Sequence, residues 1–99
     1  MLKPIPQTFT RWGYTGRILK REGDVVLAEK QDSKKPERKF YEVMLVQKHN
    51  GFTIAGKTFP PSEYLPRDDQ WGEAGWSCST IARAQEVFQR EVGKSLEGT

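Results

Sequence analysis

The strongest signal for the fold is one stretch of the sequence, Lys39-Phe40-Tyr41-Glu42-Val43-Met44-Leu45-Val46-Gln47-Lys48, which is followed by His49 and Asn50-Gly51. Its β-branched and aromatic residues favour a strand, and Asn-Gly is the preferred two-residue turn of a hairpin. A turn at Asn50-Gly51 places His49 opposite Phe52 and sets the register of everything before it. The side of the hairpin predicted to form the core then contains Tyr41, Val43, Leu45, Phe52 and Ile54.

The opposite side of this hairpin is too apolar for a face fully exposed to water, since it carries Phe40, Glu42, Met44, Val46 and Lys48. We expect a helix or the N-terminal segment to cover part of it. Upstream, residues 17–21, 22–24 and 25–30 read as strand, turn and strand, with Gly23 free to adopt the positive φ of a tight turn. Residues 31–38 are polar and include a proline, which predicts an exposed loop. Pro4 and Pro6 indicate an extended arm over residues 1–10.

Downstream of the hairpin, residues 59–70 contain three prolines and are predicted to be irregular but ordered. Residues 76–78 can add a short strand, and Ser79 or Thr80 can cap a helix that runs to about Val92 and stops at Gly93. Its packing stripe is predicted at Ile81, Ala84, Phe88 and Val92. The fold class is therefore α+β: a small antiparallel sheet of about four to five strands packed with one C-terminal helix. We expect a single domain over residues 1–99, with residues 93–99 as a frayed tail.

Composition argues against several functional classes. No apolar run approaches the roughly 20 residues that cross a bilayer, and residues 1–6 lack the apolar stretch of a signal peptide, so we expect a cytoplasmic protein without a membrane partner. One cysteine and one histidine form neither an internal disulfide nor a four-ligand zinc site. The charge is uneven: residues 1–48 carry eleven Lys or Arg and six acidic residues, whereas residues 49–99 carry five and seven. A basic half is typical of a surface that meets phosphate, and it is also the composition of a solvated face.

Residues capable of catalysis are few, and we predict that the chain is not an enzyme. It contains neither a G-x-G-x-x-G nor a G-x-x-x-x-G-K-[ST] pattern, and no nucleotide or other cofactor is expected. Cys78, just before the predicted helix, and His49 are the remote alternative of a cysteine-dependent hydrolase. Glu63, Asp68, Asp69 and Glu73 are close in sequence but lack the spacing of a known cation loop, so no metal site is predicted.

A five-residue pattern, W-G-x-x-G, occurs at residues 12–16 and again at residues 71–75. The first copy lies where aromatic and guanidinium side chains alternate, as suits single-stranded nucleic acid, because bases stack on rings while Arg neutralises phosphates. The same rings also suit a plug at one end of a small barrel-like sheet. The predicted nucleic-acid-binding residues, for DNA or RNA, are Arg11, Trp12, Tyr14, Arg17, Lys20 and Arg21.

A second function from another class uses different residues. Trp and Tyr concentrate at the energetic centres of protein interfaces. The proline-bearing segment and its neighbouring aromatic residues therefore predict, as the alternative, a protein-interaction domain that uses Tyr64, Trp71 and Trp76.

Three pieces of the chain resemble a WGR domain, a small module found in some poly(ADP-ribose) polymerases and in bacterial proteins. They are residues 39–46 for its strand, residues 71–75 for its signature, and residues 84–88 with 93–94 for its helix. The family's signature arginine, which helps contact DNA, is replaced here by Glu73. Residues 63–66 and 71–77 also resemble short bacterial and phage proteins of uncharacterised function with a W-G-x-x-G-[WF]-[ST] element.

Overall fold

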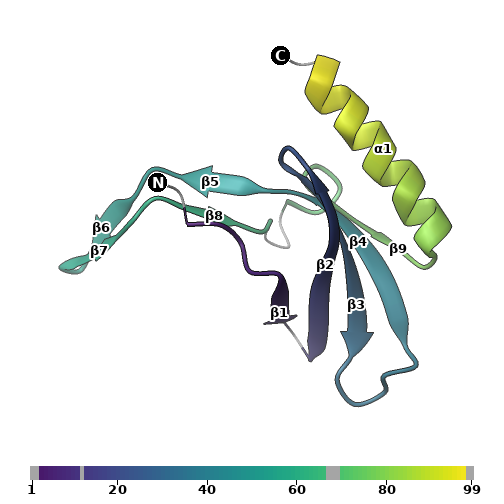
Figure 1. The fold of residues 1–99 in the computed structure, drawn as a ribbon. Coiled ribbons are helices and arrows are strands. Elements are labelled where there is room, and N and C mark those ends of the chain that lie inside the picture. Colours follow the sequence, from purple (N-terminus) through teal and green to yellow (C-terminus); the bar gives the residue numbers. More distant parts are fainter. Residues whose placement is uncertain (1–2, 12, 67–69, 98–99) are drawn as a thin grey trace.

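The computed structural model describes residues 3–11, 13–66 and 70–97. Five antiparallel strands form the main sheet in the order β1-β2-β3-β4-β9 (Figure 1). Their bounds are β1 (Thr8–Arg11), β2 (Tyr14–Glu22), β3 (Val25–Asp32), β4 (Lys39–Leu45) and β9 (Gly75–Cys78). The helix α1 (Ile81–Glu97) covers one face of this sheet. The predicted α+β class, with its antiparallel sheet and single C-terminal helix, is confirmed.

Alternation along β3 buries both faces of the sheet, because successive side chains of a strand point to opposite sides. On the side that faces α1, the helix side, Val25 and Leu27 pack with Val43, Ala84, Val87 and Phe88. On the opposite side, the arm side, Val26 and Ala28 pack with Met44, Val46 and Ile5. The apolar pattern of this second face left open whether a helix or the N-terminal segment covers it, and in the structure it is the N-terminal segment. The segment does so partly as a strand, since β1 begins within the predicted extended arm at Thr8.

The hairpin of β2 and β3 and the start of the helix agree with the sequence. Gly23 takes a φ of 59° in the predicted turn. Thr80 caps α1, because its hydroxyl oxygen accepts the backbone N–H of Arg83 at 3.2 Å. The predicted stop at Gly93 is wrong: Gly93 is not among the glycines with positive φ, and the helix continues to Glu97. A glycine inside a helix costs only about 1 kcal/mol, which packing offsets. Val87, outside the predicted stripe, is also buried.

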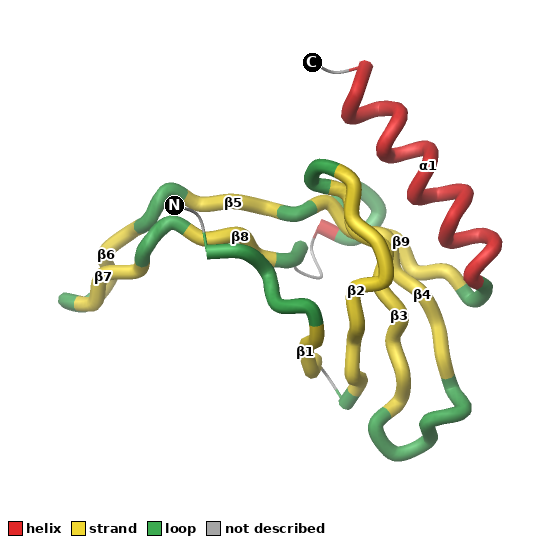
Figure 2. The backbone as a smooth tube through the Cα atoms, viewed as in Figure 1, coloured by secondary structure: helices red, strands yellow, loops and turns green. Residues whose placement is uncertain are grey.

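The register predicted for the second hairpin is wrong. The chain turns at Ala55 and Gly56, with φ of 51° and 79°, rather than at Asn50 and Gly51. Two short ladders result, in which β5 (Gln47–His49) pairs with β8 (Ser62–Tyr64) and β6 (Phe52–Ile54) pairs with β7 (Lys57–Phe59). We call residues 47–64 the ribbon; it projects from the sheet on the side away from α1 (Figures 1 and 2).

The prolines explain where the ribbon is interrupted. Proline has no N–H to give to a ladder, so Pro60 and Pro61 lie between β7 and β8, opposite the bend at Gly51. Residues 62–64 are thus a strand, although the sequence predicted an irregular segment there. Phe52 and Ile54, predicted to lie in the core, are 42% and 62% exposed on the ribbon. Tyr41 and Leu45, predicted with them, do pack on the helix side.

Candidate functional site

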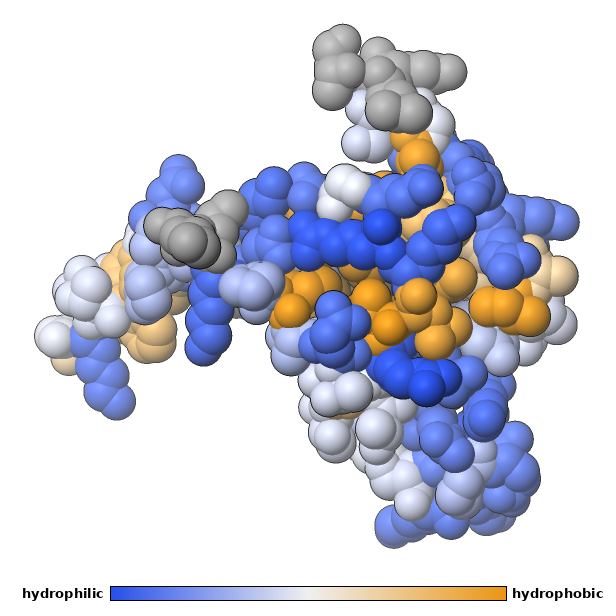
Figure 3. All heavy atoms as spheres, in the orientation of Figure 1, coloured by the Kyte–Doolittle hydropathy of each residue, from blue (hydrophilic) through white to orange (hydrophobic). Residues whose placement is uncertain are grey.

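One end of the sheet gathers basic side chains from the loop between β3 and β4 and from the neighbouring strands β2 and β4. The turn between β1 and β2 lies beside the loop between β3 and β4, because the backbone N–H of Ser33 donates to the carbonyl of Gly13 at 3.0 Å. We define the basic end by its cations, which are Arg17, Lys34, Lys35, Arg38 and Lys39. The loop lies at the foot of the sheet in Figure 2, and that region is predominantly hydrophilic in Figure 3.

The loop at the basic end has a defined shape. A carboxylate oxygen of Asp32 accepts the backbone N–H groups of Lys34 and Lys35 at 2.8 and 3.2 Å. The Asp32 N–H donates to the carbonyl of Arg38 at 3.0 Å. The backbone bonds to its carboxylate, the one from Lys34 foremost, lower the pKa of Asp32. This carboxylate therefore stays ionised as a turn-forming group and orders the segment that carries the lysines.

The cations of the basic end are available to a partner. Lys34, Lys35, Arg38 and Lys39 are exposed, and none of the four forms an ion pair with another described residue. Arg17 is 62% exposed and contacts Glu29 only at 3.7 Å. Against these five cations stand the nearby carboxylates Glu29, Asp32 and Glu37. The excess of positive charge is therefore exposed to solvent, and it belongs to the ordered loop between β3 and β4 and to the strands β2 and β4 beside it.

The six residues predicted to bind nucleic acid are not gathered on one face. The side chain of Arg11 and the whole of Trp12 lie outside the described part of the chain. Tyr14 is half-buried against Phe40 on the arm side, with ring centroids 5.2 Å apart. Lys20 lies over Phe88 on the helix side, whereas Arg21 reaches back to the arm side. Adjacent residues of a strand point to opposite sides, and the register shift between Ile18 and Lys20 places Lys20 on the helix side and Arg21 on the arm side. Of the six, Arg17 alone joins the basic end, and the loop lysines beside it were predicted only as part of an exposed loop.

The ribbon displays aromatic rings at its surface. Phe52 and Phe59 stack with centroids 4.8 Å apart, and His49 contacts Phe52 at 4.9 Å and Tyr64 at 5.9 Å. Phe59 and Tyr64 are 42% and 37% exposed. An open pocket of about 400 Å³ is lined by His49, Phe52, Tyr64 and Leu65. Figure 3 shows apolar side chains along this projection.

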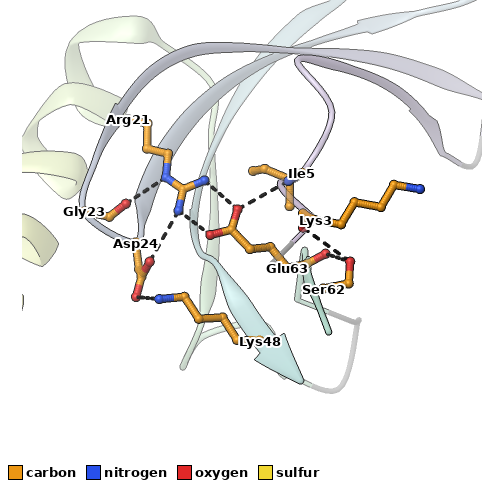
Figure 4. A network of polar contacts seen from close by, with 8 residues as sticks. All are labelled: Lys3, Ile5, Arg21, Gly23, Asp24, Lys48, Ser62 and Glu63. Atoms are coloured by element: carbon orange, nitrogen blue, oxygen red, sulfur yellow. Dashed lines mark hydrogen bonds and ion pairs between the residues drawn. The ribbon is translucent and has the colours of Figure 1, made fainter. Parts of the chain in front are cut away.

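The base of the ribbon is fixed to the sheet by a polar network (Figure 4). Arg21 donates two hydrogen bonds of 2.8 Å to the two carboxylate oxygens of Glu63. The backbone N–H of Ile5 also donates to Glu63, at 3.3 Å. The Arg21 bonds hold the pKa of Glu63 at about 2 instead of 4.5. Arg21, predicted to contact phosphate, is thus a structural residue in this fold, and Lys48 adds a 3.0 Å ion pair to Asp24.

Trp71 and Trp76, predicted as a protein-binding pair, both make internal contacts. The indole N–H of Trp71 donates to the Ser77 hydroxyl at 3.0 Å, and this hydroxyl donates to a Glu42 oxygen at 3.1 Å. The other Glu42 oxygen lies 2.7 Å from the ammonium group of Lys30, and both side chains are about 95% buried. Trp76 packs on the helix-side core under the guanidinium of Arg90. Of the predicted set, Tyr64 is exposed, whereas Trp71 and Trp76 are half-buried.

The two W-G-x-x-G copies share a local structure. Their first glycines, Gly13 and Gly72, have φ of 77° and 91°, which an L side chain rarely adopts. Their second glycines lie under aromatic rings: a Cβ on Gly16 would be 2.3 Å from the Phe9 ring, and one on Gly75 would be 2.5 Å from Trp71. In both copies the first glycine has a positive φ and the second lies in a strand beneath a ring, although residues 14–16 belong to β2 and residues 72–74 form a turn.

Cys78 does not meet the conditions for a catalytic thiol. It is 7% exposed in the helix-side core, and burial raises its pKa, so the reactive thiolate is disfavoured. His49, its proposed partner, contacts Phe52 and Tyr64 on the ribbon instead. Among the described residues, no three His, Cys, Asp or Glu side chains gather closely enough to hold a metal ion. Asp68 and Asp69 lie outside that range, and Glu63 is engaged by Arg21.

Across the described segments, no helix is both long and apolar enough to cross a membrane. No family model matches this sequence, and neither a curated protein nor a solved structure matches it.

Proposed function

We propose that this chain is a non-catalytic module that binds nucleic acid through its basic end. The observation that carries the proposal is the set of exposed cations on an ordered loop, Lys34, Lys35, Arg38 and Lys39, without ion pairs to other described residues. Such side chains gain free energy by displacing the counterions that surround nucleic acid. The ordered backbone around Asp32 lowers the entropy lost when the loop engages a phosphate chain.

Packing against other elements covers much of both sheet faces, which supports a site at the basic end. The helix packs on β3, β4 and β9 of one face, and the segment with Ile5 and Phe9 covers the other. Arg17, Gln31 and Lys39 line an open pocket on the part of the first face that α1 does not cover. The basic end lies outside these covered areas. Phosphate contacts made there would position the partner without reading its sequence, because they do not touch base edges.

Fluorescence anisotropy with labelled single- and double-stranded oligonucleotides tests this proposal. Four phosphate contacts predict that affinity for duplex falls by about 100-fold between 50 and 200 mM salt. The double variant Lys34→Ala/Lys35→Ala should bind about tenfold or more weakly at low salt, with a shallower salt dependence. The backbone N–H groups that bond Asp32 remain in this variant, so the loop keeps its turn.

The matched control removes two cations of similar exposure from the helix, as Arg83→Ala/Lys94→Ala. It changes the net charge equally and should change affinity by less than about twofold to threefold. Equal losses in both double variants would show that net charge alone drives binding. Absence of salt-dependent binding to any oligonucleotide would refute the proposed function.

A further inference from the structure

We propose that the aromatic pocket of the ribbon, formed by His49, Phe52 and Tyr64, stacks with an unpaired base of a single-stranded nucleic acid. This inference rests on the proposed function and adds a second contact of a different kind. The basic end would hold phosphates, whereas the ribbon would distinguish a single strand, with its accessible bases, from a duplex.

The first argument is the exposure of the rings. Phe52, Phe59 and Tyr64 each leave more than a third of their surface exposed, although burial of such side chains is favourable. They belong to one short projection and line or adjoin one open pocket of about 400 Å³. A flat heterocycle can lie against an exposed ring face there, and stacking of that kind tolerates any base.

The second argument is the charge around the pocket. Residues 49–61 include no carboxylate and one cation, Lys57. The acidic residue nearest in the ribbon sequence, Glu63, is neutralised by two hydrogen bonds from Arg21. A polyanion therefore meets no repulsion along residues 49–61. This absence of negative charge favours a nucleic acid over an acidic protein surface as the occupant.

The third argument is the polar edge of the pocket. Nδ1 of His49 accepts the backbone N–H of Gly51 at 3.2 Å. The neutral imidazole then carries its proton on Nε2, which leaves that nitrogen as a hydrogen-bond donor. The bond also fixes the orientation of the ring. A base stacked on Phe52 or Tyr64 would therefore meet a donor of defined position.

The fourth argument is the anchoring of the ribbon. Arg21 and Glu63 connect β2 to β8, and Lys48 of β5 pairs with Asp24. The backbone of Lys3 also forms a bridge to Ser62 of β8. These contacts order the rings before a ligand arrives. Less conformational entropy is then lost on binding, which raises affinity without a new contact.

The experiment compares three labelled probes of equal length: a single strand, the corresponding duplex, and a single strand with abasic sites through its centre. Phe52→Leu and Tyr64→Leu keep apolar side chains but remove the rings. Each should weaken binding of the intact single strand by about 5-fold or more, as expected for loss of one stacked base. Neither should change duplex affinity by more than about twofold, and the abasic strand should bind wild-type protein as weakly as the intact strand binds the variants.

Ile54→Ala is the matched control, because Ile54 is 62% exposed on the same ribbon and has no ring. It should leave single-strand affinity unchanged. If the ring variants bind the single strand like wild type while Lys34→Ala/Lys35→Ala does not, the stacking inference is overturned and the proposed function stands. If no probe binds in a salt-dependent way, the proposed function itself fails. An equal loss for Ile54→Ala would overturn the inference and indicate a general apolar surface, as in a protein interface.

Discussion

The pair of Arg21 and Glu63 holds the ribbon against the sheet, and the variant Glu63→Gln measures its contribution. The two side chains make two hydrogen bonds of 2.8 Å, and Glu63 is 10% exposed while Arg21 is 31% exposed. Gln is close in shape to Glu but lacks the charge, and it offers one acceptor oxygen where Glu63 offers two. The variant therefore keeps the packing and loses the charge-assisted pair.

The pKa of Glu63 sets an upper bound on this contribution. Lowering it from 4.5 to about 2 corresponds to at most about 3 to 4 kcal/mol at neutral pH, since one pKa unit is about 1.4 kcal/mol. Solvent around the partly exposed Arg21 screens the pair. We expect Glu63→Gln to lower the free energy of unfolding by about 1 to 2 kcal/mol at pH 7.

The pH dependence follows from the direction of this pKa change. A carboxyl whose pKa is lower in the folded state stabilises that state above its unfolded pKa, and the stabilisation disappears as pH falls through the folded pKa. For Glu63 this window runs from about 4.5 down to about 2. Urea denaturation of wild type and variant between pH 7 and pH 3 should show a difference that is constant above pH 5.5. By pH 3 less than half of it should remain. A difference that does not shrink with pH, or one below about 0.5 kcal/mol at pH 7, would refute this account of the pair.

Two further substitutions test the arm side of the sheet. Lys30→Met should lower the free energy of unfolding by about 3 to 5 kcal/mol, because it leaves the Glu42 carboxylate buried without its partner at 2.7 Å. Adding Glu42→Gln should recover part of that loss in the same urea assay. If nothing is recovered, the loss comes from packing and not from the unpaired charge. Gly16→Ala should lower the free energy of unfolding by about 1 to 3 kcal/mol, because the new Cβ would lie 2.3 Å from the Phe9 ring. Gly23→Ala is the control for backbone strain, because a Cβ at Gly23 meets no atom within 4 Å whereas its φ is positive. The double variant Phe9→Leu/Gly16→Ala should be more stable than Gly16→Ala alone. Adding Phe9→Leu to Gly23→Ala should give no such recovery.

Local patterns predicted the parts of the fold that depend on neighbouring residues. The strands β3 and β4, and β2 from Arg17 onward, follow from alternation and β-branched side chains, whereas β1 and the start of β2 were not predicted. The turn follows from Gly23, and the helix start follows from Thr80. The turn of the second hairpin could not be located in the same way. Asn50-Gly51 is the stronger turn signal by itself, but a turn there would pair Pro60 and Pro61 with strand residues. A turn at Ala55 and Gly56 places these prolines at the bend near Gly51, so the demands of the partner strand outweigh the local preference.

The composition of the chain indicated which side chains suit phosphate but not where they lie. The bulge between Ile18 and Lys20 reverses the side to which the end of β2 points, and one sequence does not reveal such a shift. The role of Arg21 depends on Glu63, 42 residues away, so only the folded chain shows that this cation is occupied. The basic loop was visible as a run of lysines. What makes it a candidate nucleic-acid-binding site is the set of contacts that order it beside Gly13.

Packing on both sheet faces limits where a partner can contact this molecule. On the helix side α1 packs against β3, β4 and β9, and on the arm side Ile5, Phe9 and Trp71 cover the sheet. The part of the helix side that α1 does not cover is where Arg17 and Lys39 line an open pocket. The buried pair of Lys30 and Glu42 and the exposed hydroxyl of Ser77 hold Trp71 over Gly75, which keeps that cover in place. Exposed side chains that do not take part in this packing then remain at the basic end and on the ribbon. Arg21 and Glu63 attach the ribbon to the sheet. A substitution at Glu63 should therefore weaken stacking of a base on the ribbon. It should leave unchanged the salt dependence of nucleic-acid binding that Lys34 and Lys35 produce.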